Sequence, residues 1–169
     1  EFRYGYASLT TPTTHYALDI VSGERKMLKR QPVLGDFKPE HYQSERLWVA
    51  ARDGTQIPLS LVYRKDNYQP GQNPLLVYGY GAYGMSEEPY FASSRLSLLD
   101  RGFIFAIAHV RGGEELGRHW YEQGRQLQKM NPFTDFIDAT EGILAAGYGD
   151  PARVFASGGS AGGLLMGAV

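Results

Sequence analysis

Short stretches that alternate between apolar and polar residues fill the first part of the chain. Residues 14–20 alternate, Ser22-Gly23 follows as a turn, and residues 25–28 are extended again. Period-two alternation broken by a Gly turn is typical of antiparallel hairpins with one solvated face. Together with an extended stretch at residues 4–9, the pattern predicts a small antiparallel sheet over residues 1–30.

Residues 31–43 contain two Pro residues and no apolar period, which indicates a linker. A second hairpin follows the linker, because residues 47–51 are extended and Asp53-Gly54 forms a turn pair. In the returning strand, alternate residues are apolar and are expected to share one face: Ile57, Leu59, Leu61 and Tyr63.

The apolar pattern changes after Pro74, where short segments become wholly apolar and helix-like segments lie between them. Strands without alternation are buried on both faces, as in parallel sheets covered by helices. The strands are expected at residues 75–78, 103–110 and 154–156, and helices at residues 94–100, near 116–127 and from 131 to a stop at Gly147. This alternation predicts an α/β domain from about residue 45 onward.

The clearest helix is expected to begin at Asn131, a favourable N-cap, with Pro132 in its first position. Its apolar face is set by residues that repeat at spacings of three and four: Phe133, Phe136, Ile137, Thr140, Ile143 and Leu144.

Charge and composition exclude several functional classes. The formal net charge is −1 and the pI is about 6.5, so charge gives no reason to expect nucleic acid or a membrane surface as a partner. The absence of Cys excludes disulfides, thiolate metal sites and a Cys nucleophile in this chain. No apolar run is long enough to span a bilayer, and no secretory leader is visible.

The candidate chemistry lies in Gly158-Gly159-Ser160-Ala161-Gly162, between the strand at 154–156 and an apolar helix start. In this setting Gly-x-Ser-x-Gly predicts the nucleophile elbow of an α/β-hydrolase, with Ser160 as nucleophile. Gly is needed at 158 and 162 because the strained turn brings the backbone against its neighbours. The N–H of Ala161 is then the natural oxyanion donor. The alternative is an ordinary Gly-rich turn with a Ser N-cap.

A serine nucleophile needs a base and an orienting acid, which follow it along the chain in this fold. Nine residues follow Ser160, and none of them is acidic or His. The four His residues precede it and are expected to be structural or surface residues: His15, His41, His109 and His119. Since the chain opens on Glu1 and Val169 lies in an apolar run without a stop signal, we expect an internal piece of a longer protein. The triad Asp and His are expected beyond Val169, and the piece alone is expected to be nearly inert.

A second Gly cluster follows the strand at 75–78 and matches G-x-G-x-x-G at Gly79, Gly81 and Gly84. Since Asp100 lies near the distance expected of a ribose-binding acid, a dinucleotide-binding module is an alternative from another functional class. Against it, Glu-Glu-Pro at residues 87–89 interrupts the required helix and would repel a pyrophosphate. In the hydrolase hypothesis, a Tyr hydroxyl of this loop supplies a second oxyanion donor.

A third cluster, residues 109–117, begins where the strand at 103–110 ends. Two roles are open for its Arg111. One is binding of a substrate carbonyl or carboxylate, and the other is anchoring of the loops through a carboxylate pair.

Several motifs occur in order and with family-like spacing: Arg3-Tyr4-Gly5-Tyr6, Thr10-Thr11-Pro12, Tyr78-Gly79-Tyr80-Gly81, Ser94-Arg95-Leu96, Val110-Arg111-Gly112-Gly113, Asn131 with Phe133 and Asp135, Gly147-Tyr148, and the six residues 158–163. With this set the chain resembles the prolyl oligopeptidase family of serine peptidases, and within it oligopeptidase B. The resemblance covers essentially all 169 residues.

The resemblance implies an α/β-hydrolase domain joined to a β-propeller that filters substrates by size. Residues 1–43 would be the end of the propeller and the linker, and residues 44–169 an incomplete catalytic domain, with a mostly parallel sheet and helices on both faces. The propeller and the remainder of the catalytic domain would belong to the same intact chain.

The resemblance also implies the chemistry. Ser160 matches the family nucleophile, and Tyr80 matches the Tyr whose hydroxyl completes the oxyanion hole with the N–H of Ala161. The family cleaves short peptides by acyl-enzyme catalysis, and the oligopeptidase B branch does so after Arg or Lys, in the cytoplasm, with no cofactor or metal.

Two positions depart from the family pattern. Glu114 stands where a third Gly usually follows Arg111, and of the acidic residues that hold a basic P2 side chain only Glu88 fits. Prolyl-specific peptidases, acylaminoacyl peptidases and esterases of the same fold therefore stay open as alternatives.

Overall fold

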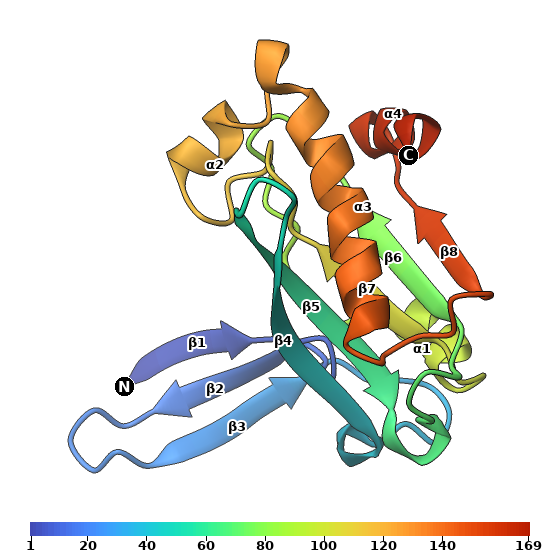
Figure 1. Cartoon of the computed structure of the whole chain (residues 1–169). Coiled ribbons are helices and arrows are strands. Elements are labelled where there is room, and N and C mark those ends of the chain that lie inside the picture. Colours follow the sequence, from blue (N-terminus) through green and yellow to red (C-terminus); the bar gives the residue numbers. More distant parts are fainter.

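The chain forms two separate β-sheets with helices around the second one, and the computed structural model describes all of residues 1–169. The first sheet contains β1 (Phe2–Tyr6), β2 (Thr14–Leu18) and β3 (Arg25–Arg30), which pair antiparallel in that order. This confirms the sheet expected from the alternating pattern. All side chains of β3 are exposed, and Figure 1 shows the three strands standing apart from the rest of the molecule.

Residues 31–41 connect the two sheets and contain one short 3-10 turn, Pro39–His41. The irregular segment expected from the sequence is therefore present, although the next strand already begins at Tyr42.

The second sheet has five strands: β4 (Tyr42–Ala50), β5 (Gln56–Arg64), β6 (Leu75–Gly79), β7 (Ile104–Ala108) and β8 (Val154–Ser157), in the order β4-β5-β7-β6-β8. β7, β6 and β8 run parallel to one another, whereas β4, β5 and β7 pair antiparallel. The wholly apolar strands thus form the parallel part of the sheet, as expected, and the hairpin adds an antiparallel part.

Helices cover both faces of this sheet (Figure 1). On one face α3 (Met130–Ala145) packs against β4, β5 and β7, and α4 (Ala161–Ala168), which follows β8, contacts both α3 and β8. On the other face α1 (Ser93–Leu99) packs against β5 and β7. A short helix, α2 (Arg118–Glu122), and a 3-10 turn, Gln126–Gln128, lie between β7 and α3, and another 3-10 turn, Lys65–Asn67, follows β5.

Each face of the sheet has its own apolar core, and β5 contributes to both. On the α3 face its buried residues are Ile57, Leu59, Leu61 and Tyr63, which confirms the period-two prediction. On the α1 face Val62 of β5 packs with Leu99, Phe105 and Ile107. No helix of the structure is both long enough and apolar enough to cross a bilayer.

The predicted start of the long helix is wrong. α3 begins one residue before Asn131, and its N-cap position is Lys129, whose backbone is already helical. The preceding 3-10 turn leads directly into the helix, so no capping side chain is required there. The Asn131 side chain instead donates to the carbonyl oxygen of Gln123 over 2.8 Å.

The predicted burial of the last strand is also wrong. In β8 only Val154 is partly buried and the other three residues are exposed. The reason is that, among residues 1–169, β8 pairs with β6 alone and lies at the edge of the sheet.

Candidate active site

Ser160 lies in the sharp turn between β8 and α4. Its backbone has φ 53° and ψ −119°, and the residue is exposed. Non-Gly residues rarely adopt a positive φ, and such strain persists only where the surrounding packing enforces it. Because Ser160 immediately precedes α4, the N–H of Ala161 lies beside it at the start of the first helical turn. The next two N–H groups, of Gly162 and Gly163, donate to the carbonyl oxygens of Gly159 and Ser160.

Two of the glycines around Ser160 are required by close backbone packing. A Cβ on Gly158 would lie 2.5 Å from the carbonyl oxygen of Gly162, and a Cβ on Gly162 would lie 2.6 Å from that of Gly79. These are the two positions at which the elbow hypothesis requires Gly. By contrast, a Cβ on Gly159 would meet nothing within 4 Å. The turn is therefore packed tightly on the end of β6 and open on the side of Gly159.

The Tyr80–Gly84 loop follows β6, the neighbour of β8 in the sheet. The two strands are parallel and in register from Leu75↔Val154 to Tyr78↔Ser157, so their carboxyl ends meet at one edge. Tyr80 is 8% exposed, and a Cβ on Gly162 would lie 3.5 Å from its Cα. The structure thus brings the predicted oxyanion loop against the predicted elbow.

The dinucleotide alternative requires a helix that begins within the Gly motif. After β6 no helix begins before α1, at Ser93, so Gly84 leads into an irregular segment instead. The geometry therefore does not support a nucleotide site at Gly79, Gly81 and Gly84.

A pocket of about 260 Å³ lies beside the elbow, between the Tyr80–Gly84 loop, the segment from α2 to α3 and the start of α4. The chain has three non-Gly residues with positive φ: Tyr83 (59°), Gln126 (49°) and Ser160 (53°). Tyr83 and Gln126 line this pocket, and Ser160 precedes Ala161, which also lines it. Because backbone strain gathers at functional sites, this pocket is the candidate active site.

Glu88 lies on the irregular segment after this loop and is exposed. Its neighbour Glu87 is partly buried and donates its backbone N–H to Oε1 of Glu115 over 2.9 Å. Burial, together with the negative charge of Glu115, raises the pKa of the Glu87 carboxyl above its usual range. Of the two acidic residues, Glu88 is the more exposed.

Arg111 is buried at the end of β7 and is bonded to two carboxylates. Its Nη2 lies 2.6 Å from Oδ1 of Asp135, and its Nη1 lies 2.7 Å from Oδ2 of Asp53. Asp135 is fully buried, and the Arg111 side chain is 5% exposed. The geometry therefore favours the anchoring role of Arg111 over direct contact with a substrate.

His109 lies in a buried polar chain. Its Nε2 is 2.8 Å from Oγ of Ser60, and its Nδ1 is 3.5 Å from Oε1 of Glu115. His119 is exposed and packs edge-on against Trp120. Both residues thus have the structural or surface character expected of them. No group of three or more His, Asp or Glu side chains is arranged to hold a metal ion.

Sequence reasoning missed several residues around the site. The strained Tyr83 and Gln126 have no sequence signal, since Gly or Asn would be expected at positive φ. The burial of Asp135 could have been predicted, because it directly precedes Phe136 on the buried side of α3, and a buried carboxylate needs a partner. Asp53 was recognised as a turn residue and not as a partner of Arg111.

Known proteins of one family resemble this chain in sequence and fold. Residues 89–169 match the sequence profile of the Prolyl oligopeptidase family. The chain is 54% identical to dipeptidyl aminopeptidase BI of Pseudoxanthomonas mexicana over 168 residues, which are 99% of this chain and 23% of that protein. It is 44% identical to protease 2 of Moraxella lacunata over 169 residues, which are 100% of this chain and 24% of that protein.

Solved structures give the same result. Oligopeptidase B from Leishmania major superposes with a TM-score of 0.89 and 47% identity, covering 98% of this chain and 23% of that one. Oligopeptidase B from Trypanosoma brucei superposes with a TM-score of 0.88 and 48% identity, with the same coverage of 98% and 23%. The chain thus spans about a quarter of the length of the relatives it matches.

A serine in a strained elbow, between a strand and a helix of a helix-covered sheet, defines the α/β-hydrolase class of fold. Within that class, residues 89–169 match the prolyl oligopeptidase family, and the whole chain is similar to peptidases of that family.

Proposed function

We propose that the intact protein is a serine oligopeptidase that cleaves short peptides through an acyl-enzyme. The observation that carries the proposal is the strained Ser160, exposed at a turn packed against the loop of Tyr80. The family relation supports the reaction class, since relatives are named as peptidases of several specificities.

In the proposed mechanism, Oγ of Ser160 attacks the scissile carbonyl carbon and gives its proton to a general base. The negative charge that develops on the carbonyl oxygen is stabilised by the N–H of Ala161 and the hydroxyl of Tyr80, each worth about 3 kcal/mol. The amine leaves with a proton from the base, and water then hydrolyses the ester on Ser160. The base and its acid partner are assigned to parts of the protein outside residues 1–169.

Cleavage after Arg or Lys is the proposed specificity, and Glu88 is proposed to bind a basic P2 side chain. The likeness to two oligopeptidase B structures supports the branch, and the exposure of Glu88 leaves its carboxylate free. The pocket beside Ala161 contains Arg125 and Lys129 and no carboxylate. The acids that hold a basic P1 side chain are therefore also assigned to parts outside residues 1–169.

The domain division is part of the proposal. Residues 1–43 are assigned to the end of a β-propeller and its linker, and residues 44–169 to the catalytic domain. The two separate sheets, joined by the irregular residues 31–41, support this division. The cytoplasmic location expected from the resemblance stays a prediction.

Covalent labelling of the full-length protein with a fluorophosphonate probe tests the nucleophile. We expect labelling of Ser160, and none after Ser160→Ala. Labelling of the Ser160→Ala protein at the wild-type rate would remove Ser160 from the mechanism.

Steady-state kinetics of Tyr80→Phe test the oxyanion hole, because the change removes one hydroxyl and keeps the ring. We expect kcat to fall about 100-fold or more with little change in KM, since the lost interaction forms only in the transition state. An unchanged kcat would remove Tyr80 from the site.

A second candidate specificity follows from the relative named dipeptidyl aminopeptidase BI. Matched peptides with Arg at P1, with either a free or an acylated N-terminus, separate endopeptidase action from removal of N-terminal dipeptides. Pro-linked and acyl-linked chromogenic substrates test the other specificities within the fold. We expect the acylated Arg peptide to be cleaved at least as fast as the free one, and a strict requirement for a free N-terminus would favour the aminopeptidase.

A further inference from the structure

Three loops pack backbone against backbone next to Tyr80, through Gly81, Gly112 and Gly124. A Cβ on Gly112 would overlap the carbonyl oxygen of Gly81, and a Cβ on Gly124 would overlap the backbone nitrogen of Gly112. The N–H of Gly84 also donates to the carbonyl oxygen of Gly112 over 3.0 Å. Because these backbones are in direct contact and the Val110 side chain also packs against Gly81, a shift of residues 110–113 moves the Tyr80–Gly84 loop directly.

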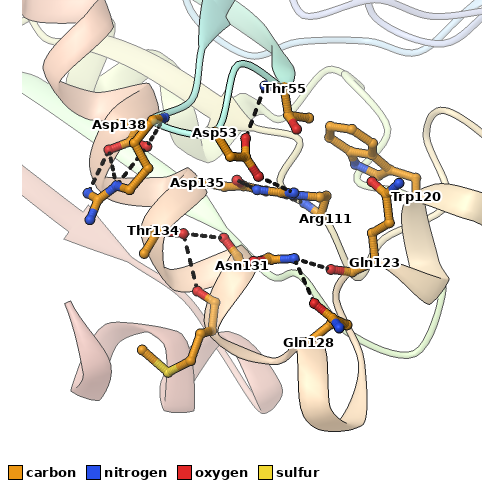
Figure 2. Close-up of polar contacts among 12 residues, drawn as sticks. Asp53, Thr55, Arg111, Trp120, Gln123, Gln128, Asn131, Thr134, Asp135 and Asp138 are labelled. Carbon is orange, nitrogen blue, oxygen red and sulfur yellow. Dashed lines mark hydrogen bonds and ion pairs between the residues drawn. The ribbon is translucent and has the colours of Figure 1, made fainter.

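Arg111 fastens the middle of these three loops. Its backbone N–H and its Nε donate to Oδ2 of Asp135 over 3.0 and 2.9 Å, and its Nη2 donates to Oδ1 over 2.6 Å. Its Nη1 donates to Oδ2 of Asp53 over 2.7 Å. Figure 2 shows the guanidinium between the two carboxylates. The loop is thereby tied both to α3 and to the turn between β4 and β5.

The guanidinium cannot be replaced here by another cation of equal charge. Its planar fork matches both oxygens of Asp135 while a third N–H reaches Asp53, whereas an ammonium is a point charge on a flexible stem. Because Asp135 is fully buried, no water competes for the bonds to its two oxygens. Arg111→Lys therefore keeps the charge and loses the geometry of the anchor.

We propose that Arg111 is a positioning residue for the oxyanion hole, which fixes through Gly112 the loop that carries Tyr80. The inference rests on the proposed function, because it assigns Arg111 to the same site. Arg111 acts through Tyr80 and does not contact the substrate.

A neighbouring ion pair provides a matched control. Arg52 and Asp138 join the same turn and the same helix, with Nη2 of Arg52 2.7 Å from Oδ1 of Asp138. The backbone N–H of Arg52 also donates to Asp138, and none of the bonds of this pair reaches residues 110–113. Arg52→Gln thus loosens the turn–helix connection without touching the loop that Arg111 holds.

The test is a double-mutant cycle in the full-length protein, with kcat and KM measured for wild type, Arg111→Lys, Tyr80→Phe and the double variant. We expect Arg111→Lys to lower kcat about 10- to 100-fold, with KM within about twofold, because misplacing the donor weakens only the transition state. In the Tyr80→Phe background the same change should lower kcat less than about threefold, since the donor it positions is absent. Arg52→Gln should leave kcat within about twofold of wild type.

An equal fall in both backgrounds would overturn the inference, because a general structural role does not depend on the Tyr80 hydroxyl. So would an unchanged kcat in a folded Arg111→Lys protein. If that variant does not fold, Asp53→Asn weakens one arm of the anchor by removing its charge at a half-exposed residue. We then expect kcat to fall several-fold in the protein that retains Tyr80, and not in the Tyr80→Phe protein. A wild-type protein without peptidase activity would refute the proposed function itself, and the inference with it.

Discussion

Gly162→Ala is the smallest change that separates the elbow from the oxyanion loop. The added Cβ would lie 2.6 Å from the carbonyl oxygen of Gly79, whereas ordinary contact begins at 3.4 Å. The oxygen belongs to the backbone and the Cβ is fixed rigidly to it, so the contact must open by about 0.8 Å through movement of α4 or of the end of β6. Gly79 directly precedes Tyr80, so the movement falls between the nucleophile and the donor.

Overpacking of this kind costs about 1–3 kcal/mol, and Ala in the first turn of a helix recovers up to about 1 kcal/mol relative to Gly. We therefore expect the free energy of unfolding to fall by about 0–3 kcal/mol, which a folded protein tolerates. The effect on activity should be larger, because a misplacement of about 1 Å can cost about 100-fold in rate.

Gly163→Ala is the matched control. It lies in the same first turn of α4, and its Cβ would come no closer than 4.0 Å to the carbonyl oxygen of Gly158. The assay compares kcat and thermal midpoints of both variants in the full-length protein. We expect Gly163→Ala to be at least as stable as wild type and active, and Gly162→Ala to lose about 10- to 100-fold in kcat. Equal activities of the two would refute the steric account of the elbow.

Three further expectations concern charge. Hydrogen bonds from Thr55, together with Arg111, lower the pKa of Asp53 to about 2, so the ionised Asp53 stabilises the fold above its usual pKa and this stabilisation is lost as pH falls toward about 2. Asp53→Asn should therefore flatten the decline of the thermal midpoint over that pH range. A decline parallel to that of wild type would contradict the assignment. Burial raises the pKa of Glu87, so the ionised carboxylate destabilises the fold once pH rises above its usual pKa. Glu87→Gln should therefore raise the thermal midpoint at about pH 7 and leave it unchanged well below pH 4. The reverse pattern would count against the assignment. Asp135→Ala leaves the buried guanidinium of Arg111 without its main partner. Denaturant titrations should show a free energy of unfolding lower by about 3–5 kcal/mol, and a loss below about 1 kcal/mol would be inconsistent with a buried pair.

The strands and the elbow could be predicted from the sequence because local patterns determine them. Period-two alternation located β5, since every second residue there packs against α3. The glycines at 158 and 162 could be predicted because a strained turn leaves no room for Cβ. In both cases the signal lies in a short stretch of sequence, a period or a motif, although one of the contacts behind it, that of Gly162 with Gly79, joins distant segments.

The remaining features depend on contacts between distant segments. Asp53 and Asp135 meet Arg111 across separations of 58 and 24 residues, which no local pattern encodes. The positive φ of Tyr83 and Gln126 is equally invisible, because tertiary packing imposes it against the preference of the residue type. Asn131 has the chemistry of an N-cap, but the 3-10 turn before it removes the helix end that it would cap.

The distance between nucleophile and donor is set by the sheet and not by either loop alone. Because β6 and β8 are parallel and paired from Leu75↔Val154 to Tyr78↔Ser157, a register shift of one residue would displace the elbow by about 3.3 Å along the sheet. A hydrogen bond to the oxyanion tolerates only a fraction of that displacement. The close approach of Gly162 to Gly79 fits the observed register, in which these two backbones meet without a side chain between them. Strain at Ser160 is thus maintained by the same contacts that align it with Tyr80, and a substitution that relaxes one should also disturb the other.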